Sequence, residues 1–279
     1  MPNIPTPPSN SALPAIQAIE FDQPLKWLVL GWKDIARHPF WSLLHGAVMT
    51  VSGLLITFIA HDQFWLLAGA ISGFLVVAPV LATSLYAMSR ADERHEKVDA
   101  ALLIRTWTRW QLNARQDPAG YWSLIQFGLL LALAATGWVL TSSALITLAA
   151  SQPIHTPLDF IHHVMLAPEG YLFEIWLLVG GLMAAPIFAS SVVSMPLLLD
   201  KRVTVLQAVM TSWKAVITHP REMAFWAFLI MGFAALGLMS LFLGLIFVVP
   251  MLGHASWHAY KDLVDTRDLT DRLSPAGVL

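Results

Sequence analysis

The 279-residue chain is 57% apolar and 12% charged, and its mean hydropathy is +0.64, whereas a soluble domain has roughly 25% charged residues. This composition is typical of an integral membrane protein in contact with a lipid bilayer. The formal charge of −2 excludes a global basic surface for nucleic acid, and the absence of cysteine excludes disulfides and thiolate metal sites.

Residues 1–24 contain six prolines and no long apolar run, and they predict a proline-rich arm. The arm has too little apolar content to fold alone, so we expect it to be disordered or extended unless a binding partner orders it. A membrane domain then covers residues 25–265, and a cytoplasmic tail covers residues 266–279.

Apolar blocks long enough to cross a bilayer as helices follow the arm. The first four cover residues 40–60, 64–88, 121–150 and 171–199. The charged, amphipathic segment 92–117 is expected to lie at the membrane surface. A last block, residues 222–260, is too long for one crossing and just long enough for two, provided that residues 237–240 form a very tight turn.

The basic residues favour two crossings in that last block. All sixteen Lys and Arg residues lie before the first span, between even-numbered and odd-numbered spans, or after the sixth span. The other connections, residues 61–63, 151–170 and 237–240, have none. Because Lys and Arg accumulate in cytoplasmic loops, this pattern predicts an all-α protein of six transmembrane helices in a bacterial inner membrane, with both termini in the cytoplasm.

A short pattern recurs three times and predicts three tandem helical hairpins. Its copies are APVLATSLYAMSR, APIFASSVVS and VPMLGHASWHAYK, aligned on Pro79, Pro186 and Pro250. Upstream, GWKDIARHP and SWKAVITHP match each other and carry Trp32 and Trp213, which we expect at the lipid headgroups. The repeat units cover about residues 25–91, 97–200 and 202–262, each an interfacial amphipathic helix followed by two spans.

The three prolines are expected to act structurally. Each removes a helical hydrogen bond and kinks its span, and the small residues after it let neighbouring helices approach closely. The alternative is that kinked helices with freed carbonyls line a transport path. A continuous polar cavity lined by Ser84, Ser191 and Ser194 would favour that alternative.

Histidines are the remaining candidates for chemistry. His254 and His258 share one helix face and are candidate ligands for haem or a metal, although two interfacial histidines bonded to carbonyls or headgroups explain the pair as well. In the external loop, His162, His163 and Met165 form a candidate copper or zinc site. We expect no cofactor outside these two sets. The chain contains no catalytic motif, so we expect it not to be an enzyme.

Three strings, FASSVVSMPLLLDKRV, TSWKAVITHPREMAFWA and GHASWHAYKDLV, resemble the bacterial integral membrane family called domain of unknown function 2189. The resemblance extends over about residues 25–265. Some members are labelled as candidate cytochrome c oxidase subunits, and the family offers no catalytic residues to compare.

The resemblance and the lack of charge inside the spans favour a non-enzymatic accessory subunit or assembly factor of a larger membrane complex, with a respiratory complex expected. The alternatives are a small-molecule or lipid transporter and a haem or copper handling protein.

Overall fold

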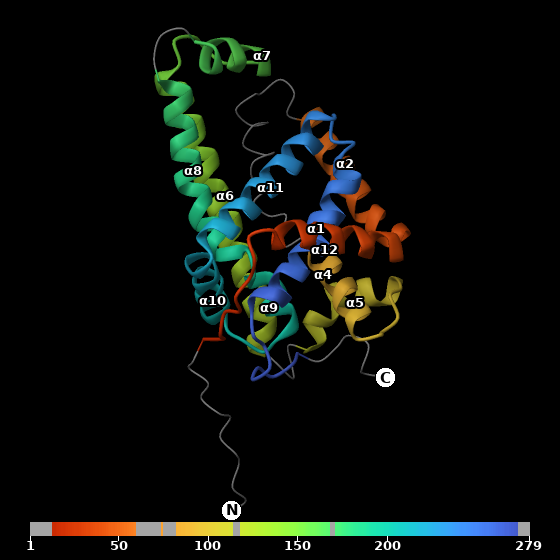
Figure 1. The fold of residues 1–279 in the computed structure, drawn as a ribbon. Coiled ribbons are helices and arrows are strands. Elements are labelled where there is room, and N and C mark those ends of the chain that lie inside the picture. Colours follow the sequence, from red (N-terminus) through yellow and green to blue (C-terminus); the bar gives the residue numbers. More distant parts are fainter. Residues whose placement is uncertain (1–12, 60–73, 75–81, 114–117, 168–170, 273–279) are drawn as a thin grey trace, which may run out of the picture.

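The computed structural model describes residues 13–59, 74, 82–113, 118–167 and 171–272, and this part of the chain is all-helical apart from two isolated β-bridges. Figure 1 shows the arrangement. The helices are α1 (Gln23–Arg37), α2 (Pro39–Ile59), α4 (Thr83–Glu93), α5 (Ala100–Asn113), α6 (Pro118–Ala149), α7 (Pro157–Phe160), the π-helix η1 (Ile161–Met165), α8 (Leu172–Ser191), α9 (Ser194–Asp200), α10 (Val205–Thr218), α11 (Pro220–Met239) and α12 (Leu245–Leu263). The predicted all-α class is confirmed there.

Four helical stretches in the described ranges are long and apolar enough to cross a membrane: Pro39–Ile59, Gln126–Ala149, Leu172–Asp200 and Pro220–Met239. They match the predicted first, third, fourth and fifth spans. Most of the predicted second span lies outside the described residues. The predicted sixth span corresponds to α12, which is not among the four.

The turn between α11 and α12 comes later than predicted. α11 continues through Gly237 to Met239, and residues 240–244 make the turn, with Leu241 (φ 54°) and Phe242 (φ 66°) in the left-handed region. Gly237 stays helical because it packs against α12: a Cβ there would meet Leu245 Cδ2 at 2.5 Å. Ser240 closes the turn, since its hydroxyl donates to Gly237 O and accepts from Gly244 N.

The two matching upstream strings form matching junctions. α1 ends at His38 with φ −128° and ψ 60°, and α10 ends at His219 with φ −126° and ψ 59°. In each case a proline, Pro39 or Pro220, begins the next helix, as proline does favourably at a first helical position.

Pro186 and Pro250 lie inside helices, and neither of them ends its helix. α12 continues through Pro250, and α8 continues through Pro186 to Ser191. The predicted fourth span is nevertheless interrupted, at residues 192 and 193, before α9 begins. The hydroxyl of Ser212 on α10 accepts a hydrogen bond from Val193 N at this break, so the amide is satisfied outside the helix. Pro79 lies outside the described residues.

The segments that follow the marker prolines meet in one core. α4, α9 and the second half of α12 pack together beneath α1 and α11. The largest fully buried side chains include Trp27, Trp226, Trp257 and Tyr260. The recurring pattern therefore marks the segments around which the molecule is packed.

Residues 13–22, the described part of the arm, are held by contacts with the rest of the chain. Ile16 pairs with Val264, Gln17 N donates to Leu263 O, and Lys214 Nζ donates to Pro14 O. Ile16 and Ile19 also pack on the core. Residues 13–22 are ordered because backbone pairing with the end of α12 replaces the burial that their sequence lacks.

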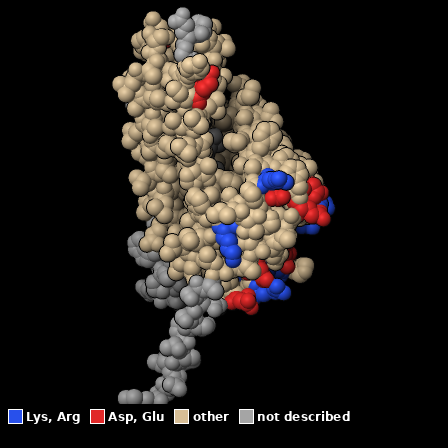
Figure 2. All heavy atoms as spheres, turned by 60° about the vertical axis from the view of Figure 1, so that its left-hand side comes forward, with Lys and Arg blue, Asp and Glu red and all other residues tan. Residues whose placement is uncertain are grey.

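The tail is held at the same end of the molecule. Lys201 pairs with Asp271, and Arg202 N donates to Thr270 O. On the face shown in Figure 2, the basic side chains lie in the lower half, away from the end that carries the loop between α6 and α8.

Candidate functional site

A buried polar cluster joins four helices, and we call it the Asp34 network. Its members are Asp34 on α1, Ser42 on α2, Ser89 on α4, and His254 and His258 on α12. Asp34 Oδ2 accepts from Ser89 Oγ at 2.7 Å and lies 2.9 Å from His258 Nε2. His254 contacts Ser89 Oγ through Nδ1 at 2.7 Å and Ser42 Oγ through Nε2 at 3.0 Å.

One assignment of hydrogens satisfies the buried part of this network. Because the Ser89 hydroxyl donates to Asp34, His254 Nδ1 donates to Ser89 and His254 Nε2 accepts from Ser42. His254 is then neutral, and both of its ring nitrogens are hydrogen-bonded. A fully satisfied network of this kind rigidifies a core, whereas an unpaired buried member would be costly.

Asp34 is held as a carboxylate. Burial raises the pKa of Asp34, but hydrogen bonds from His258 and Ser89, together with the nearby histidines, outweigh burial and leave this pKa below its usual value. Arg37 Nη1 lies 3.0 Å from the second carboxylate oxygen. The negative charge is therefore balanced by neighbours on α1 and α12.

A second carboxylate extends the cluster toward the surface. His38, the residue between α1 and α2, contacts Asp92 at the end of α4 through Nε2 and Oδ1 at 2.7 Å. Arg37 Nη1 lies 3.7 Å from the other oxygen of Asp92. The start of α2 and the end of α4 are thus fixed side by side.

The Asp34 network was missed in the sequence because its members come from distant segments. A signal was present: its members depart from the repeat. Asp34 stands where the later copy of its string has Ala215, and His254 stands where the other units have Thr83 and Ser190. The first and third units depart from the pattern at positions that contact one another.

The predicted histidine pair is brought together with Asp34. With both nitrogens engaged, His254 offers none to haem iron or a metal in this arrangement. Ser42 and His254 also carry a hydroxyl-to-imidazole contact of the kind found in hydrolases. Both side chains are 0% exposed, however, and neither lines the cavities described below, so no route for a substrate reaches that hydroxyl through them.

A second cluster, the Asp200 network, ties the ends of α4, α9 and α12 to the tail. Arg90 Nε and Arg94 Nη2 lie 2.9 Å and 3.0 Å from Asp200 Oδ1, and Tyr260 donates to Oδ2 at 2.9 Å. Arg90 also donates to the backbone oxygen of Arg272 at 2.6 Å. Asp200 is 1% exposed, so its charge is compensated by several donors at once.

Glycines bring α12 into backbone contact with α1 and α2. A Cβ at Gly46 would lie 2.1 Å from Ile246 O, and a Cβ at Gly31 would lie 2.5 Å from Met251 O. Ile246 is the residue whose carbonyl Pro250 leaves without its helical donor. This carbonyl packs against Gly46 of α2, and the structural role of the proline stays a prediction.

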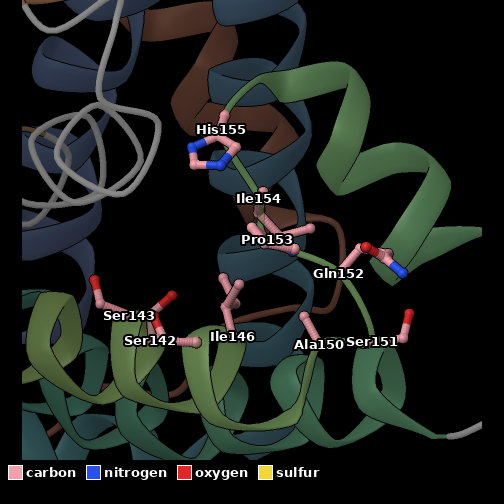
Figure 3. A pocket seen from close by; sticks show the side chains of 10 residues that line it. Ser142, Ser143, Ile146, Ala150, Ser151, Gln152, Pro153, Ile154 and His155 are labelled. Atoms are coloured by element: carbon pink, nitrogen blue, oxygen red, sulfur yellow. The ribbon is translucent and has the colours of Figure 1, made fainter.

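Two of the molecule's cavities are lined by described residues near the sites above. An apolar one of about 400 Å³ lies between α2, α4, α11 and α12. A more polar one of about 450 Å³ lies where α6 meets the following loop. Figure 3 shows His155 on that loop above Ser142 and Ser143 of α6, with Gln152 set apart from them.

The serines that would favour a transport path line neither of these cavities. The hydroxyl of Ser191 donates to Phe188 O, and that of Ser194 donates to Ser190 O. Both bonds are local to the chain around the break between α8 and α9.

The external-loop histidines lie in η1. His162 and Met165 are exposed and His163 is half-buried. Asp159 is engaged elsewhere, because backbone N–H groups of His155 and Thr156 donate to it and lower its pKa. Within the described ranges, no three His, Cys, Asp or Glu side chains gather as a metal site requires. The copper or zinc site stays a prediction.

The predicted headgroup tryptophans lie on α1 and α10. Trp32 is about half exposed, near Phe247 of α12, and Trp213 donates from Nε1 to Ser190 Oγ at 2.9 Å. Each therefore has an exposed edge and a contact with a neighbouring helix.

Comparison with known proteins gives one match. No curated protein and no solved structure matches the chain. Residues 66–200 match a family model described as a predicted integral membrane protein (DUF2189). The family whose model this stretch of the chain matches is therefore the one predicted from the sequence, a family of integral membrane proteins whose function is unknown.

Proposed function

We propose that this protein is a non-enzymatic accessory subunit or assembly factor of a larger membrane complex. The observation that carries the proposal is the open surface of the α6–α8 pair, whose upper end extends beyond α11 in Figure 1. In the most apolar 18-residue stretch, 6% is buried in Leu172–Asp200 and 17% in Gln126–Ala149, against 28% in Pro39–Ile59. A membrane helix of a partner would cover part of this surface.

Small residues on α8 favour a helix over lipid as the neighbour. Gly181, Ala184 and Ala185 are all exposed, and a Cβ at Gly181 would have no neighbour within 4 Å. In membranes, such positions let two helices approach closely, because packing replaces the hydrophobic effect as the driving force. The family resemblance noted in the sequence makes a respiratory complex of the cytochrome oxidase type the first one to test.

Purification from native membranes in mild detergent, followed by mass spectrometry, tests the proposal. We expect the tagged chain to be recovered with a defined set of membrane proteins. Gly181→Leu is expected to release them, whereas Gly232→Leu, at an equally open position on α11, is expected to retain them. Recovery of the wild-type chain alone as a monomer would contradict the proposal.

We further propose the six-span topology, as three hairpins with both termini in the cytoplasm of a bacterium. The contact between His38 and Asp92 supports a return of the chain across the membrane after α2, since both residues lie at one end of the molecule. At the same end, His219 contacts Gln17 O and Asp262 accepts from Gln23. These contacts support α11 and α12 as an outward and a returning span.

Reporters that are active only outside the cytoplasm test this topology. A fusion after Arg272 is expected to be inactive, and an insertion between residues 151 and 156 is expected to be active. Activity of the C-terminal fusion would overturn the six-span proposal.

A further inference from the structure

The apolar cavity between α2, α4, α11 and α12 has the composition of a ligand site. Its walls include Met49 of α2, Ile230, Ala234 and Leu238 of α11, and Val249 and Leu252 of α12. Its volume of about 400 Å³ falls within the roughly 300–1,000 Å³ of small-molecule sites. Among the described residues of its lining there is no Asp, Glu, Lys, Arg or His, so a charged ligand would lose its hydration without compensation from them.

Among the described residues of the lining, the polar side chains are two hydroxyls that lie together. Tyr86 of α4 and Ser256 of α12 both line the cavity, and they are hydrogen-bonded to each other. The Ser256 hydroxyl donates to Leu252 O at 2.7 Å. A hydroxyl group can both donate and accept a hydrogen bond, so the two together offer a position that suits the hydroxyl of a ligand.

The cavity borders the outer surface of α11, one of the stretches apolar enough to cross a membrane. Met231 in its wall is 61% exposed. An apolar molecule in the hydrocarbon layer would therefore meet this wall directly and would need no passage through water.

We propose that this cavity binds an uncharged amphiphile from the bilayer, with the apolar body between α11 and α12 and a hydroxyl at Tyr86 and Ser256. The proposal concerns binding and does not depend on a partner complex or on translocation.

Photolabelling in phosphatidylcholine nanodiscs tests the site. The probes are a long-chain primary alcohol with a diazirine in its chain and the matching alkane, and adducts are mapped by peptide mass spectrometry. We expect the alcohol to label Met231 and Leu252 in preference to Phe228, an exposed residue of α11 that does not line the cavity.

Two variants distinguish labelling inside the cavity from labelling by general contact with lipid. Ala234→Phe fills the cavity and is expected to lower labelling of its walls by about tenfold. Ala224→Phe makes the same change at an exposed position of α11 outside the cavity and is expected to leave labelling unchanged. Gel filtration and thermal unfolding check that each variant is folded.

The hydroxyl end is tested separately. Tyr86→Phe and Ser256→Ala are each expected to lower alcohol labelling by about two- to tenfold, the usual worth of one hydrogen bond, and to leave alkane labelling unchanged. Equal labelling of wild type and folded Ala234→Phe, or adducts spread evenly over Phe228 and the cavity, would overturn the site. Loss of both probes to the same extent in Tyr86→Phe would overturn the assigned orientation.

Discussion

The bundle around α12 and the α6–α8 pair differ in how closely their small residues are packed. α12 contacts α1, α2 and α4 through glycine and buried polar side chains, and each contact is completed by the chain itself. In the α6–α8 pair, Gly180 packs on Trp138, but a Cβ at Gly137 or Gly181 would have no neighbour within 4 Å. The difference teaches that glycines in one membrane protein can pack closely against a neighbouring helix in one region and stay open in another.

The largest expected effect comes from removing the carboxylate at the centre of the first region. Asp34→Ala leaves His258 and Ser89 without their shared acceptor, and breaking a buried, paired charge costs about 3–5 kcal/mol. We expect a large drop in the thermal unfolding temperature of the purified protein in detergent. Asp34→Asn keeps the shape of the side chain and one acceptor oxygen, so it should lower the unfolding temperature less. Equal stability of Asp34→Ala and wild type would mean that the network does not hold the helices together.

Adding one methyl group distinguishes the two regions directly. Gly46→Ala places a Cβ against Ile246 O, where the backbone has to shift, and overpacking of this kind costs about 1–3 kcal/mol. Gly181→Ala adds the same group where no atom lies within 4 Å, and there alanine's better helix propensity favours a neutral or slightly stabilising effect. Thermal unfolding of the two variants, measured side by side, checks this. Equal destabilisation would remove the contrast.

The smallest expected effect is a loss of stability in acid. The pKa of Asp34 is lower in the folded protein than its ordinary value near 3.8. The contribution of Asp34 to the free energy of unfolding is therefore present above its ordinary pKa and is lost as the pH falls through the folded pKa. For one group, the slope is at most about 1.4 kcal/mol per pH unit. Unfolding measured from about pH 5 downward should show a weaker pH dependence in Asp34→Asn than in wild type. An unchanged slope would assign the acid sensitivity to other carboxylates.

The sequence was informative wherever a local pattern decides the structure. Hydropathy predicted α2, α6, α8 and α11, and the string ending in His-Pro predicted two junctions that share one backbone conformation. The turn at Leu241 and Phe242 could not be predicted, because neither residue favours positive φ and its position follows from the packing of Gly237 on Leu245. The break at Val193 likewise depends on Ser212, which belongs to another helix.

The candidate site was predicted only in part. His254 and His258 stood out by their spacing, but their partner Asp34 lies more than 200 residues earlier in the chain, and spacing alone cannot identify it. Comparison of the repeat units was the one sequence signal for the contact, since Asp34 and the histidines are each peculiar to one unit. The contacts of residues 13–22 could not be predicted for a similar reason: the backbone around Val264, with which they pair, lies at the other end of the sequence.

The separation of 224 residues between Asp34 and His258 has a consequence for the order of synthesis. At the ribosome's rate of about 5–20 residues per second, α1 and α2 emerge on the order of 10–40 s before the histidines that complete their polar contacts. Thr50 of α2 waits in the same way for the carbonyl of Phe242. During that interval the polar groups of α1 and α2 lack their partners on α12, and no helix packs against their glycines. The bundle is therefore completed only when its last helix is made. A ribosome that stops before α12 would leave α1 and α2 without these contacts.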